Sequence, residues 1–432
     1  MSVNLTCKLS DRSLDRNQSS SQRQLAIAIS ANAAFDGNNA PLNLCLVLDH
    51  SGSMGGQPLD TVKRAARDLV DCMYPQDRIS VVGFDHKAHV VVENQPVDRI
   101  ESIKAKIQSL KASGGTCIDD GIKLGLQETS KGKDGTVSQI FVLTDGENEH
   151  GDNERCFQFS RLATEYNMTL HSLGFGDSWN QDVLERIADA GGGAMAYIAS
   201  PEAAGEEFQK LLKRVQAIGL TNAHLILQLA PHVRLAELKP IAQVAPDTIE
   251  LAYQTEGDAI IVRLGDLMTD VERVVLFNLY ISPASYIAEY PTSSEIPILT
   301  VQVRYDIPSL AQINSLSSPA PVTAELVQDF VPQVNPQVQN HLLALAKYRQ
   351  TQLAEQKLQQ GDRAGAATML QSAAKTALQM GDEKASTILQ NNATRLQTGT
   401  TLSEADRKKT RIASKTVLQP PTNPSTDPST NL

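Results

Sequence analysis

The sequence is poor in the features that nucleic-acid-binding and membrane-spanning proteins need. Aromatic residues make up only 4% of its 432 residues, and acidic residues outnumber basic ones by 49 to 39, which gives a formal net charge of −10. Because a nucleic-acid backbone requires a basic surface and single strands require stacking aromatics, we expect no nucleic-acid partner. No apolar run reaches the ~20 residues needed to cross a bilayer, so we also expect no membrane span.

Cysteine is scarce too, and its spacing forms no recognisable pattern. The five cysteines are odd in number, scattered, and include no C-x-x-C pair, which argues against a disulfide framework. Residues 1–30 are polar and lack the continuous apolar core of a secretory signal, so we expect a cytoplasmic protein. The composition is that of a globular chain, and at roughly 150 residues per domain its length predicts two or three domains.

Residues 39–220 alternate strand-like and helix-like segments. A short apolar run, Asn43–Leu48, precedes a helical pattern over Leu59–Met73, and further pairs of this kind follow. This alternation predicts an α/β domain with a doubly wound, mostly parallel sheet that has helices on both faces. Ligands bind such sheets beyond the carboxyl ends of the strands, so the turns at that edge are the candidate site.

Residues 221–334 show short strand-like runs separated by Pro, Gly and Asp turns, and no helical pattern. This spacing predicts an antiparallel β-sandwich. The early segment Gln24–Ser30 alternates Leu25, Ile27 and Ile29 in the same manner, although it precedes the α/β domain. We therefore predict that residues 1–38 belong to the sandwich and that the α/β domain is inserted into it.

The remaining chain is predicted to form a small helical region. Within residues 335–400, two Gly-Asp steps begin at Gly361 and Gly381, where Gly ends one helix and Asp caps the next. This pattern predicts three antiparallel helices joined by short turns, a helical hairpin region. Residues 401–432 are predicted to form a short helix whose basic run, Arg407–Arg411, is solvated, and a disordered tail rich in Pro, Thr and Ser.

Oxygen-bearing side chains gather at the predicted strand ends. Asp49, Ser51 and Ser53 directly follow the first strand of the α/β domain, Thr116 precedes a helix, and Asp145 follows an apolar strand. Taken singly, each residue also suits a helix cap or a turn. Together they place three hydroxyls and two carboxylates at one edge of one predicted sheet.

This set resembles the metal-ion-dependent adhesion site of von Willebrand factor type A (VWA) domains. The D-x-S-x-S pattern matches at Asp49, Ser51 and Ser53, the threonine at Thr116 and the later aspartate at Asp145. The resemblance implies that the hydroxyls bind the ion directly and that the carboxylates act directly or through water. Oxygen-only coordination of this kind suits Mg²⁺, or Mn²⁺ as a substitute.

The resemblance also implies a function. The architecture is similar to that of bacterial proteins that pair a VWA domain with a flanking β domain and a C-terminal helical hairpin. Such a protein is expected to be a metal-dependent protein-interaction module, a scaffold or assembly factor whose ion is completed by an Asp or Glu of another protein. The expected rim of the partner-binding site consists of His50, Gly52, Gly115, Glu147 and Glu149.

The residues of the candidate site give less support to an enzymatic function. A haloacid-dehalogenase-type phosphatase needs a second Asp where Ser51 stands, and neither a Walker lysine nor a G-x-S-x-G elbow is present. His50 is the nearest candidate base, but we expect it to point outward. We therefore expect no enzymatic activity. The alternative function is that of an accessory recognition subunit in an ATPase or chelatase-like complex, and a metal-dependent phosphatase is the third hypothesis.

Overall fold

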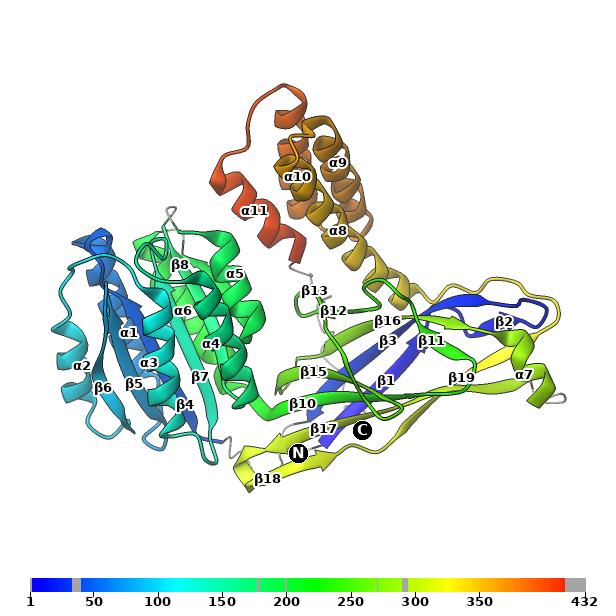
Figure 1. Ribbon diagram of the computed structural model, residues 1–432, viewed down its shortest axis with the longest axis horizontal. Helices are drawn as coiled ribbons and strands as arrows, with labels where there is room; N and C mark the ends of the chain where they lie inside the picture. The colour runs from blue at the N-terminus through cyan, green and yellow to red at the C-terminus, as the bar shows by residue number, and fades with distance from the viewer. Residues whose placement is uncertain are drawn as a thin grey trace, which may run out of the picture.

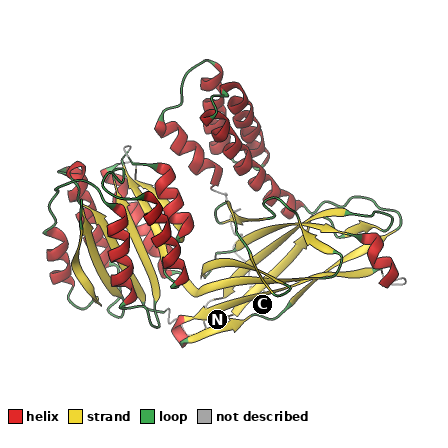
Figure 2. Cartoon of the chain, in the orientation of Figure 1, coloured by secondary structure: helices red, strands yellow, loops and turns green. Residues whose placement is uncertain are grey.

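Three structural units make up the chain: an α/β domain, a β-sandwich and a helical region that contacts both (Figure 1). The computed structural model describes residues 2–32, 40–176, 179–198, 200–269, 271–289 and 294–415. Figure 2 shows how helices and strands divide among the units. Within these ranges no helix is both long and apolar enough to span a membrane.

The α/β domain contains a six-stranded sheet in the order β6-β5-β4-β7-β8-β9. Its strands are β4 (Leu42–Asp49), β5 (Arg78–Phe84), β6 (Ala88–Pro96), β7 (Val137–Thr144), β8 (Thr169–Phe175) and β9 (Gly192–Ile198). All neighbouring strands are parallel except β6, which pairs antiparallel with β5. The predicted doubly wound, mostly parallel sheet is confirmed.

Helices cover both faces of this sheet because its central strand is apolar on both sides. Leu44, Leu46 and Leu48 of β4 face one core, whereas Cys45 and Val47 face the other. The first core is closed by α1 (Gln57–Asp71), α2 (Ile100–Gln108) and α6 (Pro201–Gln216). The second is closed by α3 (Ile118–Ser130), α4 (Asn153–Glu165) and α5 (Gln181–Ala190).

The second unit is a sandwich of two mostly antiparallel sheets. One sheet contains β1 (Ser2–Leu9), β3 (Ser21–Asn32), β16 (Arg273–Ile281), β12 (Ile241–Ala245), β13 (Ile249–Glu250) and β11 (Val233–Leu235). The other contains β14 (Gln254–Glu256), β15 (Ala259–Met268), β10 (Ile218–Leu229), β17 (Glu295–Ile307), β19 (Ala320–Val327), β2 (Ser13–Asp15) and β18 (Gln312–Leu316). Because β3 pairs along its length with β16, the predicted insertion of the α/β domain into the sandwich is confirmed.

The described part of the sandwich region also contains a helix that the sequence pattern does not reveal. A short helix, α7 (Pro283–Glu289), follows β16. It is only seven residues long, too short to show a helical period in the sequence. The hydroxyl of its buried Tyr286 lies 2.7 and 2.8 Å from the carbonyl oxygens of Pro231 and Pro297, which share its single proton, and this contact ties the helix to the sandwich.

Within the described residues the helical region has four helices, which confirms the three predicted antiparallel helices and the short helix predicted after them. They are α8 (Pro336–Gln359), α9 (Arg363–Gln379), α10 (Glu383–Gln397) and α11 (Glu404–Lys415). Gly361 and Gly381 adopt φ values of +80° and +77°, and Asp362 and Asp382 cap the helices that follow, as the sequence predicted. Helix α8 packs its apolar side chains against the outer face of the β12–β16–β3 sheet.

The prediction that the basic run of α11 is solvated was wrong for two of its residues. The side chain of Arg411 is 14% exposed and contacts Asp182 and Glu185 of α5, at 2.6 and 2.8 Å, as well as Glu355 of α8. Lys408 is buried over the ring of Trp179. These partners are distant in sequence, so the run alone could not reveal them. The predicted disordered tail lies in residues 416–432, outside the described ranges.

Candidate metal centre

Asp49 lies at the carboxyl end of β4 and is completely buried. Its Oδ1 atom accepts a hydrogen bond from the backbone N–H of Ser51 at 2.8 Å, and its Oδ2 atom accepts one from the hydroxyl of Thr144 at 2.5 Å. Burial raises the pKa of Asp49 to about 6, although these hydrogen bonds act in the opposite direction. The carboxylate is thus held rigidly in an environment that disfavours its charge.

Three of the predicted ligands form a continuous row of oxygens beside it. The hydroxyls of Ser51 and Ser53 lie 3.0 Å apart, and the Ser53 hydroxyl donates to Oδ1 of Asp145 at 2.8 Å. The turn that carries the serines is a short 3-10 helix, η1 (Gly52–Met54), whereas Asp145 follows β7. Two neighbouring parallel strands therefore end at the same point, as a doubly wound sheet predicts.

Thr116 is brought to this edge by a loop that hydrogen bonds to the Ser51–Ser53 turn. The N–H of Gly52 donates to the carbonyl of Gly114 at 3.0 Å. A Cβ atom added to Gly146 would lie 3.5 Å from the Thr116 hydroxyl and 4.0 Å from the Ser53 hydroxyl. Thr116 therefore faces the same loop as Ser53, and the structure brings together all five residues that the sequence singled out.

The loop before Thr116 requires two glycines. Gly114 has a φ of +66°, which favours glycine. Gly115 lies under the ring of His150, where an added Cβ would come within 2.3 Å of a ring carbon. A side chain at Gly114 would strain the backbone, whereas one at Gly115 would displace the exposed His150 ring.

The five residues fit a small, hard divalent cation. Among the described residues, no Lys or Arg forms an ion pair with Asp49 or Asp145, and burial raises the pKa of both carboxyl groups. A cation would offset that cost. Two ligands at right angles, 2.0–2.1 Å from Mg²⁺, would be about 3.0 Å apart, close to the oxygen separations in the row.

The expected rim is only partly correct, because His50 points inward. His50 is 5% exposed, its Nδ1 lies 3.0 Å from the carbonyl oxygen of Lys111, and its ring stacks edge-on with His89. It fits there because the neighbouring strand has Gly83, where an added Cβ would lie 3.1 Å from the His50 ring. Of the other four expected rim residues, three are exposed and one is half-buried. The exposed residues are Gly52, Glu147 and Glu149, and the half-buried residue is Gly115.

Three residues that position the site were missed by sequence reasoning. Thr144 orients Asp49 as described above. Asp85 accepts a hydrogen bond from the Ser113 hydroxyl at 2.8 Å and so holds the Thr116 loop. Asn148 accepts one from the N–H of Ile118 at 2.7 Å and so joins the Asp145 loop to the start of α3. Their polar side chains beside predicted strand ends were the available signal, but their partners are remote in sequence.

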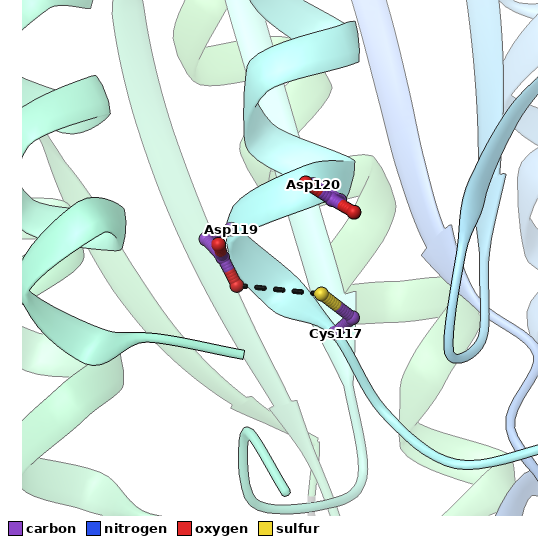
Figure 3. A group of neighbouring side chains, drawn as sticks. All are labelled: Cys117, Asp119 and Asp120. Carbon is purple, nitrogen blue, oxygen red and sulfur yellow. Dashed lines mark hydrogen bonds between the residues drawn. The ribbon is translucent and has the colours of Figure 1, made fainter. Parts of the chain in front are cut away.

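A second cluster of potential ligands, Cys117, Asp119 and Asp120, lies at the start of α3 (Figure 3). Asp119 is already neutralised, because it accepts from the Cys117 thiol at 3.4 Å and forms an ion pair with Arg155 at 3.0 Å. Arg155 also reaches Asp120 at 3.6 Å. Burial raises the pKa of the Cys117 thiol to about 11, so the thiol stays protonated. This cluster ties α3 to α4 and does not resemble a cation site.

Comparisons with known proteins match both the α/β domain and the helical region. A model of the von Willebrand factor type A domain matches residues 43–211, and a model described as the Sll0103-like, C-terminal alpha-helical domain matches residues 336–420. The protein sll0103 of Synechocystis sp. is 55% identical over 428 residues, which cover 98% of this chain and 100% of that protein. The chain belongs to the Sll0103-like family of VWA domain proteins. VWA domains are generally protein-interaction modules.

Solved structures extend the likeness to the whole fold. The von Willebrand factor type A protein from Catenulispora acidiphila is similar with a TM-score of 0.80 and 16% identity, covering 96% of this chain and 97% of that one. The ArnB paralog VWA2 from Sulfolobus acidocaldarius has a TM-score of 0.59 and 15% identity, covering 96% and 98%. At such identities the likeness concerns the fold alone.

Other relatives share only part of their length with the chain. Inter-alpha-trypsin inhibitor heavy chain H4 of Homo sapiens is 29% identical over 189 residues, which cover 40% of this chain and 20% of that protein. The chain therefore spans about a fifth of the length of this relative, and the likeness concerns one region of it.

Proposed function

We propose that the chain is a Mg²⁺-dependent protein-binding module of the cytoplasm, a scaffold or assembly factor without enzymatic activity. The observation that carries this proposal is the pair of carboxylates, buried Asp49 and half-buried Asp145, that lie beside three hydroxyls without a basic residue of the described chain to neutralise them. Mn²⁺ is expected to substitute for Mg²⁺.

The roles of the chain's own residues follow from their charges. Ser51, Ser53 and Thr116 are neutral, so as ligands they leave the cation electrophilic, while Asp49 and Asp145 balance its charge. The bound ion supplies an electrostatic attraction for an Asp or Glu of the partner. His50 is sequestered by a backbone carbonyl and by His89, so it is poorly placed to act as a general base.

Affinity capture tests this proposal. The full chain is immobilised and exposed to native extract in Mg²⁺, and we expect bound protein to be released by EDTA and recaptured when Mg²⁺ or Mn²⁺ is restored. Capture that is unchanged in EDTA would contradict the proposal. Recovery of an ATPase among the released proteins would favour the alternative, an accessory recognition subunit of such a complex.

The acidic rim should influence which partners bind. Replacing both Glu147 and Glu149 by Gln is expected to lower Mg²⁺ affinity by roughly two- to tenfold, or to change the set of captured proteins, because exposed charges near the ion act through screened attraction. The control is Glu237→Gln, an equally exposed acid in the sandwich. If neither Mg²⁺ affinity, measured by titration calorimetry, nor the captured set changes, the rim has no such role.

A further inference from the structure

A cavity of about 390 Å³ with several charged side chains in its wall lies where the VWA domain, the sandwich and α11 meet, and it has no role in the proposed metal site. Its lining includes His171 of β8, Arg214 of α6, Arg263 of β15, Arg273 of β16 and Lys415 of α11. Figure 1 shows these elements converging between the two domains and the helical region. Gln139 of β7 also lines it, six residues before Asp145 and therefore roughly 20 Å from the metal centre along the strand.

Two arginines in this cavity lack a carboxylate partner. Arg273 donates to the carbonyls of Leu264 and Asp266, and Arg263 donates to the carbonyl of Thr164 at 3.3 Å. No carboxylate of the described residues lies within ion-pair distance of either guanidinium. Burial lowers the pKa of both guanidiniums, that of Arg273 to about 10, although the charge of Asp266 acts in the opposite direction on each. Each guanidinium has more N–H donors than these contacts use.

The two acids on this side of the cavity are engaged elsewhere. Asp247 pairs with Arg214 at 3.4 Å, and Oδ2 of Asp266 accepts from Gln139 and Thr169, both at 2.7 Å. Three guanidiniums thus stand against two carboxylates, which leaves an excess of one positive charge. At the other end of the cavity, Arg411 and Lys415 face four carboxylates, those of Asp182, Glu185 and Asp189 of α5 and Glu355 of α8, so the positive excess is confined to the side of Arg263 and Arg273.

Unused polar atoms also line the cavity. Thr248 is completely buried, yet its hydroxyl has no hydrogen-bond partner in the described structure, and the same is true of Nε2 of Gln181. Both residues belong to the cavity wall. A buried polar group without a partner is costly, so each is expected to be satisfied by something inside the cavity. Water could satisfy these two atoms, but water would leave the excess charge of the arginines unneutralised.

We propose that this cavity binds a small organic anion whose carboxylate or phosphate group lies against Arg263 and Arg273. Guanidinium groups bind both oxyanions through paired N–H donors, and the Thr248 hydroxyl and the Gln181 amide supply further donors. The volume lies within the range of small-molecule pockets. Since three units of the fold form the wall, the bound anion would stabilise their mutual arrangement.

Thermal unfolding of the full chain in EDTA tests this proposal independently of the metal site. We expect inorganic phosphate or citrate to raise the melting temperature saturably, and chloride at equal ionic strength not to do so; the more effective probe identifies the phosphate or the carboxylate as the preferred group. The shift should disappear in Arg263→Gln and persist in Arg234→Gln, an exposed arginine of the sandwich. If both probes act no better than chloride, the cavity holds only water and the proposal is overturned.

Thr248→Val separates a binding role from a structural one. The substitution removes an unpartnered hydroxyl while preserving side-chain shape, so the protein without ligand should be as stable as before or more stable. Affinity for the effective probe should fall roughly tenfold. An unchanged affinity would exclude Thr248 from the site, and an unchanged affinity in Arg263→Gln as well would refute the proposal. Neither outcome affects the proposed metal-dependent function.

Discussion

Asp49→Ala is expected to abolish metal-dependent partner binding while the chain still folds. Asp49 aligns the Ser51 backbone through its Oδ1 atom and supplies one of two charges that balance the ion. Removing a group that orients metal ligands typically lowers metal affinity about 10–100-fold. Because Asp49→Ala also removes a balancing charge, we expect its Mg²⁺ affinity to fall by about 100-fold or more. Affinity capture with and without EDTA and Mg²⁺ titration calorimetry measure the two effects.

The matched control is Asp49→Asn, which keeps the side-chain shape and one oxygen acceptor. The pKa of Asp49 in the folded state, about 6, lies above its unfolded value of 3.8. The folded state therefore loses stability as pH rises from about 4 to about 6 and the carboxyl group loses its proton. At pH 7 the buried negative charge lowers the free energy of unfolding. Without metal, Asp49→Asn should therefore be more stable than the parent chain by about 1–3 kcal/mol. Added Mg²⁺ should raise the melting temperature of the parent only. Partner capture that survives both substitutions would refute the metal-dependent mechanism.

Asp382→Ala is expected to destabilise the helical region by about 2–4 kcal/mol, the sum of a lost helix cap and a lost hydrogen bond to a charged group, and the largest effect on stability that we predict. Asp382 caps α10 by accepting from the N–H of Ala385 at 3.0 Å, and its other oxygen lies 3.1 Å from the ammonium of Lys347. The Lys347 side chain is completely buried in α8. Removing the carboxylate costs the cap and leaves a buried charge without this partner.

The chain provides its own control for this prediction. Asp362 caps α9 in the same way and pairs with Lys357 at 2.8 Å, but both side chains are more than a third exposed. Asp362→Ala should therefore cost much less than Asp382→Ala, because its ion pair is screened by solvent. Hydrogen exchange of the α10 amides reports the local effect, because unfolding of a chain with several domains is not a single transition. Equal protection losses in the two variants would show that the Lys347 pair adds nothing.

The same two caps show which features the sequence could predict and which it could not. The Gly-Asp steps predicted where α9 and α10 begin, because capping depends on residues within one turn of each other. They did not reveal that Asp382 also meets Lys347, which lies 35 residues away. The basic run of α11 was misinterpreted for the same reason, since its acidic partners on α5 are 226 and 229 residues distant.

The candidate metal site was largely readable from local patterns. Asp49, Ser51 and Ser53 stand together in sequence, and the periodicity of the α/β domain predicts that Thr116 and Asp145 reach the same edge of the sheet. His50 was placed wrongly because its direction depends on space beside Gly83 in the neighbouring strand, which no local pattern encodes. The positioning contacts from Thr144, Asp85 and Asn148 depend on tertiary approach in the same way.

The sequence by itself determined the type of each unit and the residues of the candidate ion site, because hydrophobic period, helix caps and strand-end motifs act over a few residues. Only the tertiary structure decided which charges are neutralised. Arg411 finds carboxylates on two other helices, whereas Arg263 and Arg273 are half-buried at the junction with no ion-pair partner among the described residues. The physical reason is that the energy of a charge depends on its burial and on neighbours across the fold, and neither is encoded in its own stretch of chain.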